Sequence, residues 1–261
     1  MRATRGRGSS AAGAPGPTIE VATWTPIETT EVDGWVLGFS GGFTRRANSV
    51  LPWRAPADLV SALEAVEAAY AARGLPCVVR VDASAQPGHL DALLAARGYA
   101  AIATTRVMAT DVDAVGSLDA ESRDGATLRV AEEPDDDWLA GWLDVKAAAG
   151  RVDPALARAV VTGSPALYLA ACDATGTAGV VRAGLAGEWV GLSCLMVAPR
   201  ARRRGLARRL SAAALEVAGK HGATRAFLQV EASNAGAAAL YAGLGLVVVD
   251  EYHYRERPMP A

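Results

Sequence analysis

The chain has 261 residues, of which 51% are hydrophobic and 21% are charged, and its formal net charge is −2 at pH 7. This composition predicts a globular protein, because a chain with so many apolar residues can form a packed core. The near-neutral charge argues against a nucleic-acid partner, since nucleic-acid-binding domains are usually basic. No stretch approaches the roughly 18 uninterrupted apolar residues of a membrane helix, so no membrane partner is predicted.

The cysteines indicate a reducing compartment. Cys77, Cys172 and Cys194 are widely spaced and form no Cys-x-x-Cys pair. An odd number of such thiols is typical of reduced cysteines and gives no support for a zinc site or a disulfide framework. We therefore expect a cytoplasmic protein that holds no metal ion.

The N-terminal part of the chain is expected to form a tail and a first unit. Residues 1–17 contain three arginines followed by Gly, Ser, Ala and Pro, and no apolar run for a signal peptide. This pattern favours a solvated tail over a basic arm that touches phosphate. Within residues 18–117, hydrophobic periodicity and turn residues predict strands at Trp35–Phe39, Ala47–Leu51, Cys77–Val81 and Ala101–Met108, and helices at Pro56–Ala72 and His89–Ala96.

A polar stretch, Leu118–Gly125, is the predicted linker to a second unit at residues 126–261. Three closely spaced apolar runs with short turns between them predict an antiparallel meander. The expected strands are Thr127–Val130, Leu167–Cys172, Gly179–Ala183, Trp189–Val197 and Ala223–Val230, followed by a final hairpin at Leu246–Arg255. The expected helices are one carrying Trp138 and Trp142 on one face, Pro154–Thr162, Gly205–Gly219 and Asn234–Gly243.

The stretch Leu195–Leu210 carries the strongest functional signal. A buried strand ends at Pro199, an arginine-rich loop follows, and a helix begins among the small residues Gly205 and Ala207. The first N–H groups of a helix have no intrahelical partner and carry the positive end of the helix dipole. Small side chains let a phosphate approach these groups closely, so the pattern predicts a phosphate or pyrophosphate site.

These residues resemble the signature Arg/Gln-x-x-Gly-x-Gly/Ala of the GNAT superfamily of N-acetyltransferases, with Arg202, Gly205 and Ala207 at its fixed positions. A second feature resembles the family downstream, where Tyr241 follows Asn234 by seven places. Leu246 stands where the family usually has Phe. The resemblance implies an α/β GNAT fold, a mixed and mostly antiparallel sheet flanked by helices, for residues 126–261.

The resemblance also implies that acetyl-CoA is the cofactor. Its pantetheine arm would pair with the central strand, beside Asn234, and Tyr241 would stand near the thioester sulfur and protonate the departing thiolate. The residues that the resemblance assigns to acetyl-CoA are Leu195, Met196 and Val197 on the strand and Arg202, Arg203, Arg204, Gly205, Leu206, Ala207 and Arg208 in the loop.

The general base is less defined. An amine must lose a proton before or during attack, and Glu231, just before Asn234, is the predicted base. Related enzymes often carry a glutamate two places earlier, where this chain has Gln229. Glu231 as a surface or hydrogen-bonding carboxylate stays an equal alternative, and Glu188 and His253 are weaker candidates.

The first unit partly repeats the second. Arg80–Ser84 parallels Gln229–Ser233, and Ala92–Tyr99 parallels Ala239–Leu246. The first unit lacks the arginine–glycine loop, so it is interpreted as a partial, degenerate GNAT-like unit; chance similarity of alanine-rich helices is the alternative. Its polar segment Gly41–Ser49 is placed for substrate contact.

These patterns together predict a bacterial-type enzyme that transfers acetyl from acetyl-CoA directly to a primary amine of a small molecule or peptide, and they leave a homodimer open. Two alternatives remain: an acyltransferase for a thiol-sugar amine, as in mycothiol synthesis, and a catalytically silent acyl-CoA-binding sensor.

Overall fold

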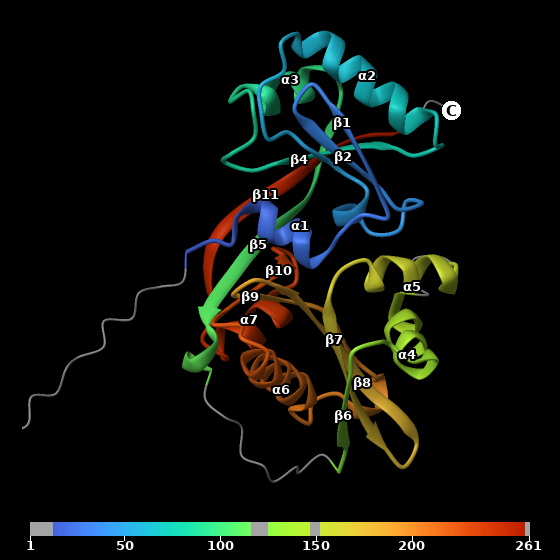
Figure 1. Ribbon diagram of the computed structural model, residues 1–261, viewed down its shortest axis with the longest axis vertical. Coiled ribbons are helices and arrows are strands. Elements are labelled where there is room, and N and C mark those ends of the chain that lie inside the picture. The colour runs from blue at the N-terminus through green and yellow to red at the C-terminus, as the bar shows by residue number, and fades with distance from the viewer. Residues whose placement is uncertain (1–12, 116–124, 147–151, 259–261) are drawn as a thin grey trace, which may run out of the picture.

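The computed structural model describes residues 13–115, 125–146 and 152–258 (Figure 1). The predicted linker falls almost wholly outside these residues, as does most of the predicted tail. The described helices are α1 (Gly16–Thr23), α2 (Leu59–Ala71), α3 (Leu90–Ala96), α4 (Asp136–Lys146), α5 (Pro154–Thr162), α6 (Leu206–Lys220) and α7 (Ala235–Ala242). The strands are β1 (Glu28–Val32), β2 (Trp35–Phe39), β3 (Val50–Leu51), β4 (Cys77–Val81), β5 (Ala100–Asp111), β6 (Thr127–Ala131), β7 (Ala166–Asp173), β8 (Gly176–Ala186), β9 (Trp189–Val197), β10 (Arg225–Glu231) and β11 (Val247–Arg257). None of the helices in the described ranges is long and apolar enough to cross a membrane.

In the described part of the chain, the strands form one mixed sheet of eleven strands in the order β1-β2-β3-β4-β11-β5-β10-β9-β8-β7-β6. The predicted meander is confirmed, because β7, β8 and β9 pair antiparallel in sequence order. Strands of the two predicted units interleave at the centre of the sheet: β11 lies between β4 and β5, and β5 lies between β11 and β10 (Figure 1).

Helices cover both faces of the C-terminal half of the sheet. Alternate residues of a strand point to opposite faces, and in β7 Leu167 and Leu169 belong to the core under α6, whereas Tyr168 belongs to a second core with Trp138 and Trp142 of α4. A third core joins α2 and α3 to the N-terminal strands, with Leu63, Val66, Tyr70, Trp35 and Leu37 at its centre.

Two expected boundaries are wrong in the first unit. The predicted helix start at Pro56 is wrong, because α2 begins only at Leu59, where Asp58 Oδ1 accepts hydrogen bonds from the backbone N–H groups of Val60 and Ser61 at 3.0 and 3.3 Å. A side-chain cap of this kind satisfies helix-end donors that Pro56 cannot. The predicted strand Ala47–Leu51 shortens to β3, because residues Arg45–Ala47 form a 3-10 turn, η1.

The predicted C-terminal hairpin is also wrong. Residues Val247–Arg257 form one long strand, β11, which pairs antiparallel with β4 on one side and with β5 on the other. The stretch has no glycine or proline to turn the chain. Its pairing with β5 shifts register at Val248/Asp250 and at Tyr252/Tyr254, as at a β-bulge, and then continues.

Helix α1, which the sequence did not predict, packs on the sheet at a pair of glycines that carry no side chain. Gly184 of β8 faces Gly191 of β9 across the ladder. A Cβ at Gly184 would lie 2.6 Å from the carbonyl oxygen of Thr23, and a Cβ at Gly191 would lie 2.8 Å from its hydroxyl oxygen. The two glycines therefore let the C-terminal end of α1 approach the sheet backbone, which brings Glu20 into the protein.

Candidate active site

The site begins where two parallel strands separate. β9 and β10 pair from Trp189/Arg225 to Leu192/Leu228 and no further. Beyond these residues, β9 stays paired with β8 as far as Val197, and β10 stays paired with β5 as far as Glu231. The facing edges of the two strands thus diverge, and an extended ligand can pair with the free edge of β9 as an added strand.

A cleft of about 730 Å³ lies over this divergence. It gathers five of the predicted site residues, Leu195, Met196, Glu231, Asn234 and Tyr241. Val197 and the predicted loop residues Arg202–Arg208 lie outside its lining, and the loop follows the end of β9 directly.

The arginine loop has the backbone that a helix-start anion site needs. Gly205 is the N-cap of α6 and has a left-handed φ of 78°, and Arg203 also has a positive φ of 64°. No side chain caps the helix, so its first N–H groups stay available. Arg202 Nε donates to the carbonyl oxygen of Val197 at 3.1 Å, and Arg208 Nη1 donates to that of Gly243 at 2.7 Å. These two arginines hold the loop against the end of β9 and the end of α7.

Helix α7 presents Asn234 and Tyr241 to the same cleft. The seven-residue spacing corresponds to about two helical turns, which places both residues on one side of the helix. Asn234 caps α7, since its Oδ1 accepts a hydrogen bond from the N–H of Ala237 at 3.1 Å. Tyr241 is buried, and burial, with a smaller contribution from Cys194, raises its pKa above the ordinary value. Its phenol therefore keeps its proton throughout the physiological pH range.

The predicted base is exposed and ion-paired. Glu231 Oε1 lies 3.3 Å from Arg45 Nη1, and about half of each side chain is exposed. Gln229, two residues earlier, is half-buried and also lines the cleft. The weaker candidates lie elsewhere: His253 Nε2 is 2.8 Å from Asp91, and Glu188 is at the opposite end of β9, beside Arg225.

The N-terminal segment Gly41–Ser49 borders the cleft, as the sequence indicates. Its Gly42, Thr44, Arg45, Arg46 and Asn48 line the cavity. Asn48 shapes the segment: its Oδ1 accepts from the N–H groups of Ser40 and Gly42 at 2.7 and 2.9 Å, and its Nδ2 donates to the carbonyl oxygens of Phe43 and Thr44, both at 2.8 Å.

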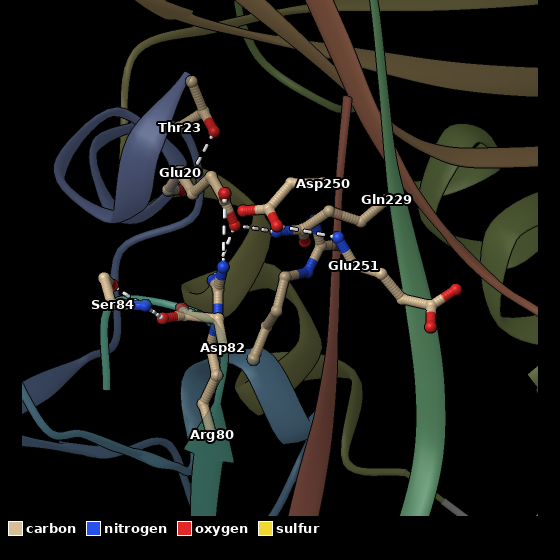
Figure 2. A network of polar contacts seen from close by, with 9 residues as sticks. Glu20, Thr23, Arg80, Asp82, Ser84, Gln229, Asp250 and Glu251 are labelled. Atoms are coloured by element: carbon tan, nitrogen blue, oxygen red, sulfur yellow. Dashed lines mark hydrogen bonds and ion pairs between the residues drawn. The ribbon is translucent and has the colours of Figure 1, made fainter. Parts of the chain in front are cut away.

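Sequence reasoning missed other residues of the site. Trp24 follows α1, and Tyr252, Tyr254 and Glu256 come from β11; all four line the cleft. Glu20 of α1 and Arg80 of β4 form a buried ion pair beside it (Figure 2). No local pattern marks these residues, because only the packing of α1 and the pairing of β11 bring them to the cleft.

Comparison with known proteins agrees with this geometry. The family model described as "Probable histone acetyltransferase Rv0428c C-terminal" matches residues 18–257. The Bacillus subtilis protein YobR, described as an N-acetyltransferase, is 26% identical over 243 residues, which cover 91% of this chain and 95% of YobR.

Solved structures share the fold. A GCN5-related N-acetyltransferase from Kribbella flavida superposes with a TM-score of 0.68 at 17% identity, covering 95% of this chain and 98% of that one. A tandem GNAT protein from the clavulanic acid biosynthesis pathway gives a TM-score of 0.61 at 18% identity, covering 96% and 91%. Since the family model spans nearly the whole chain, the protein belongs to this acetyltransferase family and is an N-acetyltransferase with the GNAT fold.

Proposed function

We propose that the protein transfers acetyl from acetyl-CoA to a primary amine by direct attack, without a covalent enzyme intermediate. The observation that carries this proposal is the divergence of β9 and β10 over the cleft, with the arginine loop at the end of β9 and Tyr241 in the lining. Such a site can hold two reactants in attack geometry, which contributes several kcal/mol to lowering a barrier. The three widely spaced cysteines agree with action in the reducing cytoplasm.

The residues present fit acetyl-CoA. Leu195, Met196 and Val197 offer a strand edge that β10 does not pair with. A Cβ built on Gly205 would meet nothing within 4 Å, so the helix start is open to a phosphate group. Arg203, Arg204, Leu206, Ala207 and Arg208 complete this pyrophosphate cradle, Arg202 holds it against β9, and Asn234 lies beside the pantetheine path. Bound acetyl-CoA supplies an activated acetyl thioester.

Two side chains move protons in this proposal. The Tyr241 phenol donates its proton to the sulfur as charge develops there, because desolvation keeps the phenol protonated. Glu231 collects the proton that the amine nitrogen loses once the new N–C bond forms, directly or through water. Arg45 holds the Glu231 carboxylate at the rim of the cleft.

We also infer a division into residues 18–117 and residues 126–261, with the first unit a partial GNAT. Both units contain a strand, a short helix and a long strand in the same order, β4-α3-β5 and β10-α7-β11. The tandem arrangement named for one structural neighbour supports this inference.

The test is a thiol-release assay with acetyl-CoA against peptide N-termini, polyamines, aminoglycosides and amino acids. Release that depends on both acetyl-CoA and an amine is the expected result. Calorimetric binding of acetyl-CoA with no release from any amine would instead indicate a silent sensor.

A further inference from the structure

A buried carboxylate connects the first helix to the centre of the cleft. The side chains of Glu20 and Arg80 are only 3% and 4% exposed, and Arg80 Nη1 and Nη2 lie 2.6 and 3.3 Å from the two Glu20 oxygens. Gln229 Nε2 donates a hydrogen bond to the same carboxylate (Figure 2). Burial disfavours the charge of Arg80, but its contacts with Glu20 raise its pKa overall. Arg80 therefore stays a cation.

The partners of Gln229 determine which way its amide points. Arg46 Nη1 donates to Gln229 Oε1 at 2.7 Å, on the side opposite to the bond with Glu20. A guanidinium has only donors and a carboxylate has only acceptors. Turning the amide over would place its NH₂ group against Arg46 and its oxygen against Glu20, and both hydrogen bonds would be lost. The amide oxygen is therefore held on the side of Arg46.

Gln229 occupies the apex of the site. It is the first residue of β10 beyond the last pair with β9, and both Gln229 and Arg46 line the cleft. A carbonyl oxygen accepts two hydrogen bonds, and Arg46 uses one of them. No other donor to Oε1 is found among the described residues, so its second lone pair is available to a ligand N–H group in the cleft.

We propose that Gln229 Oε1 accepts a hydrogen bond from the N–H of the acceptor amine, that Glu20 is the positioning residue that holds this oxygen toward the cleft, and that the amine binds in its uncharged form. This inference rests on the proposed function, because it specifies how the same site receives its acceptor.

Arg46 and the Gln229 amide together favour an uncharged acceptor amine. The Arg46 cation shares the oxygen that would receive the amine, so an ammonium group there would be repelled by a like charge. The amide itself cannot take up a proton. The acceptor class is therefore amines with a pKa near 8, such as α-amino groups, rather than lysine side chains with a pKa near 10.4.

The remaining cleft carboxylates do not alter this assignment. Among the described lining residues they are Glu231, which is paired with Arg45, and Glu256. Glu256 lies four residues beyond Tyr252, which the register places level with Glu231 through Thr105. At about 3.4 Å per residue, Glu256 is more than 10 Å farther along the sheet.

The first test compares two probes, glycinamide with its α-amino group and Nα-acetyl-lysine amide with its ε-amino group, at pH 6–10. At pH 7 kcat/KM for glycinamide should exceed that for the lysine probe by roughly 10²-fold, following the uncharged fraction of each amine. The glycinamide profile should level off near pH 8, whereas the profile of the lysine probe should still rise at pH 10. Profiles that level off at one shared pH would show that an enzyme group takes the proton first, and would overturn the proposal.

The second test uses variants of the full chain. Gln229→Leu should lower kcat/KM for glycinamide roughly tenfold with the KM for acetyl-CoA unchanged. Glu20→Gln, whose amide can donate as well as accept, should raise the KM for glycinamide severalfold and add little in the double variant. Asp82→Asn is the matched control, because Asp82 is the other carboxylate at Arg80, 3.1 Å from its Nε, and does not contact Gln229.

Equal effects of Glu20→Gln and Asp82→Asn would reduce Glu20 to a structural role, and unchanged glycinamide kinetics in Gln229→Leu would remove Gln229 from the acceptor site. The probe profiles and Gln229→Leu stay decisive even if Glu20→Gln unfolds. A wild-type protein that releases no thiol with any amine would refute the proposed function itself, whereas release with coinciding profiles refutes only this inference.

Discussion

Tyr241 is a buried residue that lines the cleft. Its backbone carbonyl also accepts hydrogen bonds from Leu244 and Leu246, which end α7 and direct the chain into β11. The side chain is thus fixed by both packing and backbone. A rigid donor of this kind needs no reorganisation when charge develops on the sulfur, which is where preorganised groups contribute most.

Tyr241→Phe tests this role, because it keeps the ring and removes only the phenolic proton. We expect the turnover number to fall by roughly 10²–10⁴, the usual contribution of a positioned acid or base. Acetyl-CoA affinity should change little, since the hydroxyl acts as charge develops. Near-normal turnover, under conditions where chemistry limits the rate, would show that Tyr241 is only a packing residue. The control is an unchanged melting temperature of the variant.

The loop before α6 depends on backbone conformation as much as on charge. Gly205 adopts a left-handed φ that disfavours other residues, and its surroundings are open. A substitution at Gly205 can weaken acetyl-CoA binding through backbone strain or through charge. Two side chains of equal size, one charged and one neutral, distinguish these causes.

Gly205→Asp should weaken acetyl-CoA binding by roughly tenfold, about 1.4 kcal/mol, because it places an anion where the pyrophosphate docks. Gly205→Asn has the same size, is neutral and tolerates a left-handed backbone, so it should lose clearly less affinity in calorimetric titration. Equal losses would point to backbone strain, and no loss in either variant would remove the loop from the site.

Asp91 of α3 links the N-terminal helices to β11. The hydrogen bond from Arg255, with burial opposing and His253 adding, lowers the pKa of Asp91 to about 2. A depressed carboxyl pKa stabilises the fold above the unfolded value of about 3.9, and this stabilisation is lost as the pH falls toward 2.

Asp91→Asn should therefore lower the free energy of unfolding at pH 7 by about 0.5–1 kcal/mol, a value reduced by the exposure of the pair. The difference from wild type should shrink between pH 4 and pH 2 in denaturant titrations. Glu216→Gln is the control, because the Glu216 carboxylate forms an ion pair with Lys220 one turn away and with no other described residue. A difference that persists at pH 2 would assign the effect to packing.

Local patterns predicted most helices and strands, and long-range packing explains the failures. The meander and the arginine loop depend on neighbouring residues, so their sequence patterns indicate them. The conformation of residues Leu246–Arg255 depends on pairing with β4 and β5, which are distant in the chain. The hairpin prediction is wrong for that reason. No local pattern distinguishes Glu20 from a surface glutamate. It is buried against Arg80 only because α1 packs on Gly184 and Gly191.

The two halves of the protein share one sheet, but the arginine–glycine motif occurs only in the C-terminal half of the sequence. The N-terminal half has no Arg-x-x-Gly-x-Gly/Ala loop in its sequence. We therefore expect one acetyl-CoA per chain by isothermal titration. Two equivalent sites would show that the N-terminal half also binds acetyl-CoA. Gly205→Asp provides the check, since it should weaken a single site but leave a second site at its wild-type affinity.

The position of β11 also determines when the sheet can be completed during synthesis. β4 and β5 leave the ribosome long before Val247, yet their shared neighbour β11 is made after all the other described strands. Until then, each keeps an open hydrogen-bonding edge that can recruit another chain. Joining strands so far apart in sequence is also entropically slow. A nascent chain stalled before β11 would thus lack the strand that joins β4 to β5, and β1–β4 would stay separate from the rest of the sheet.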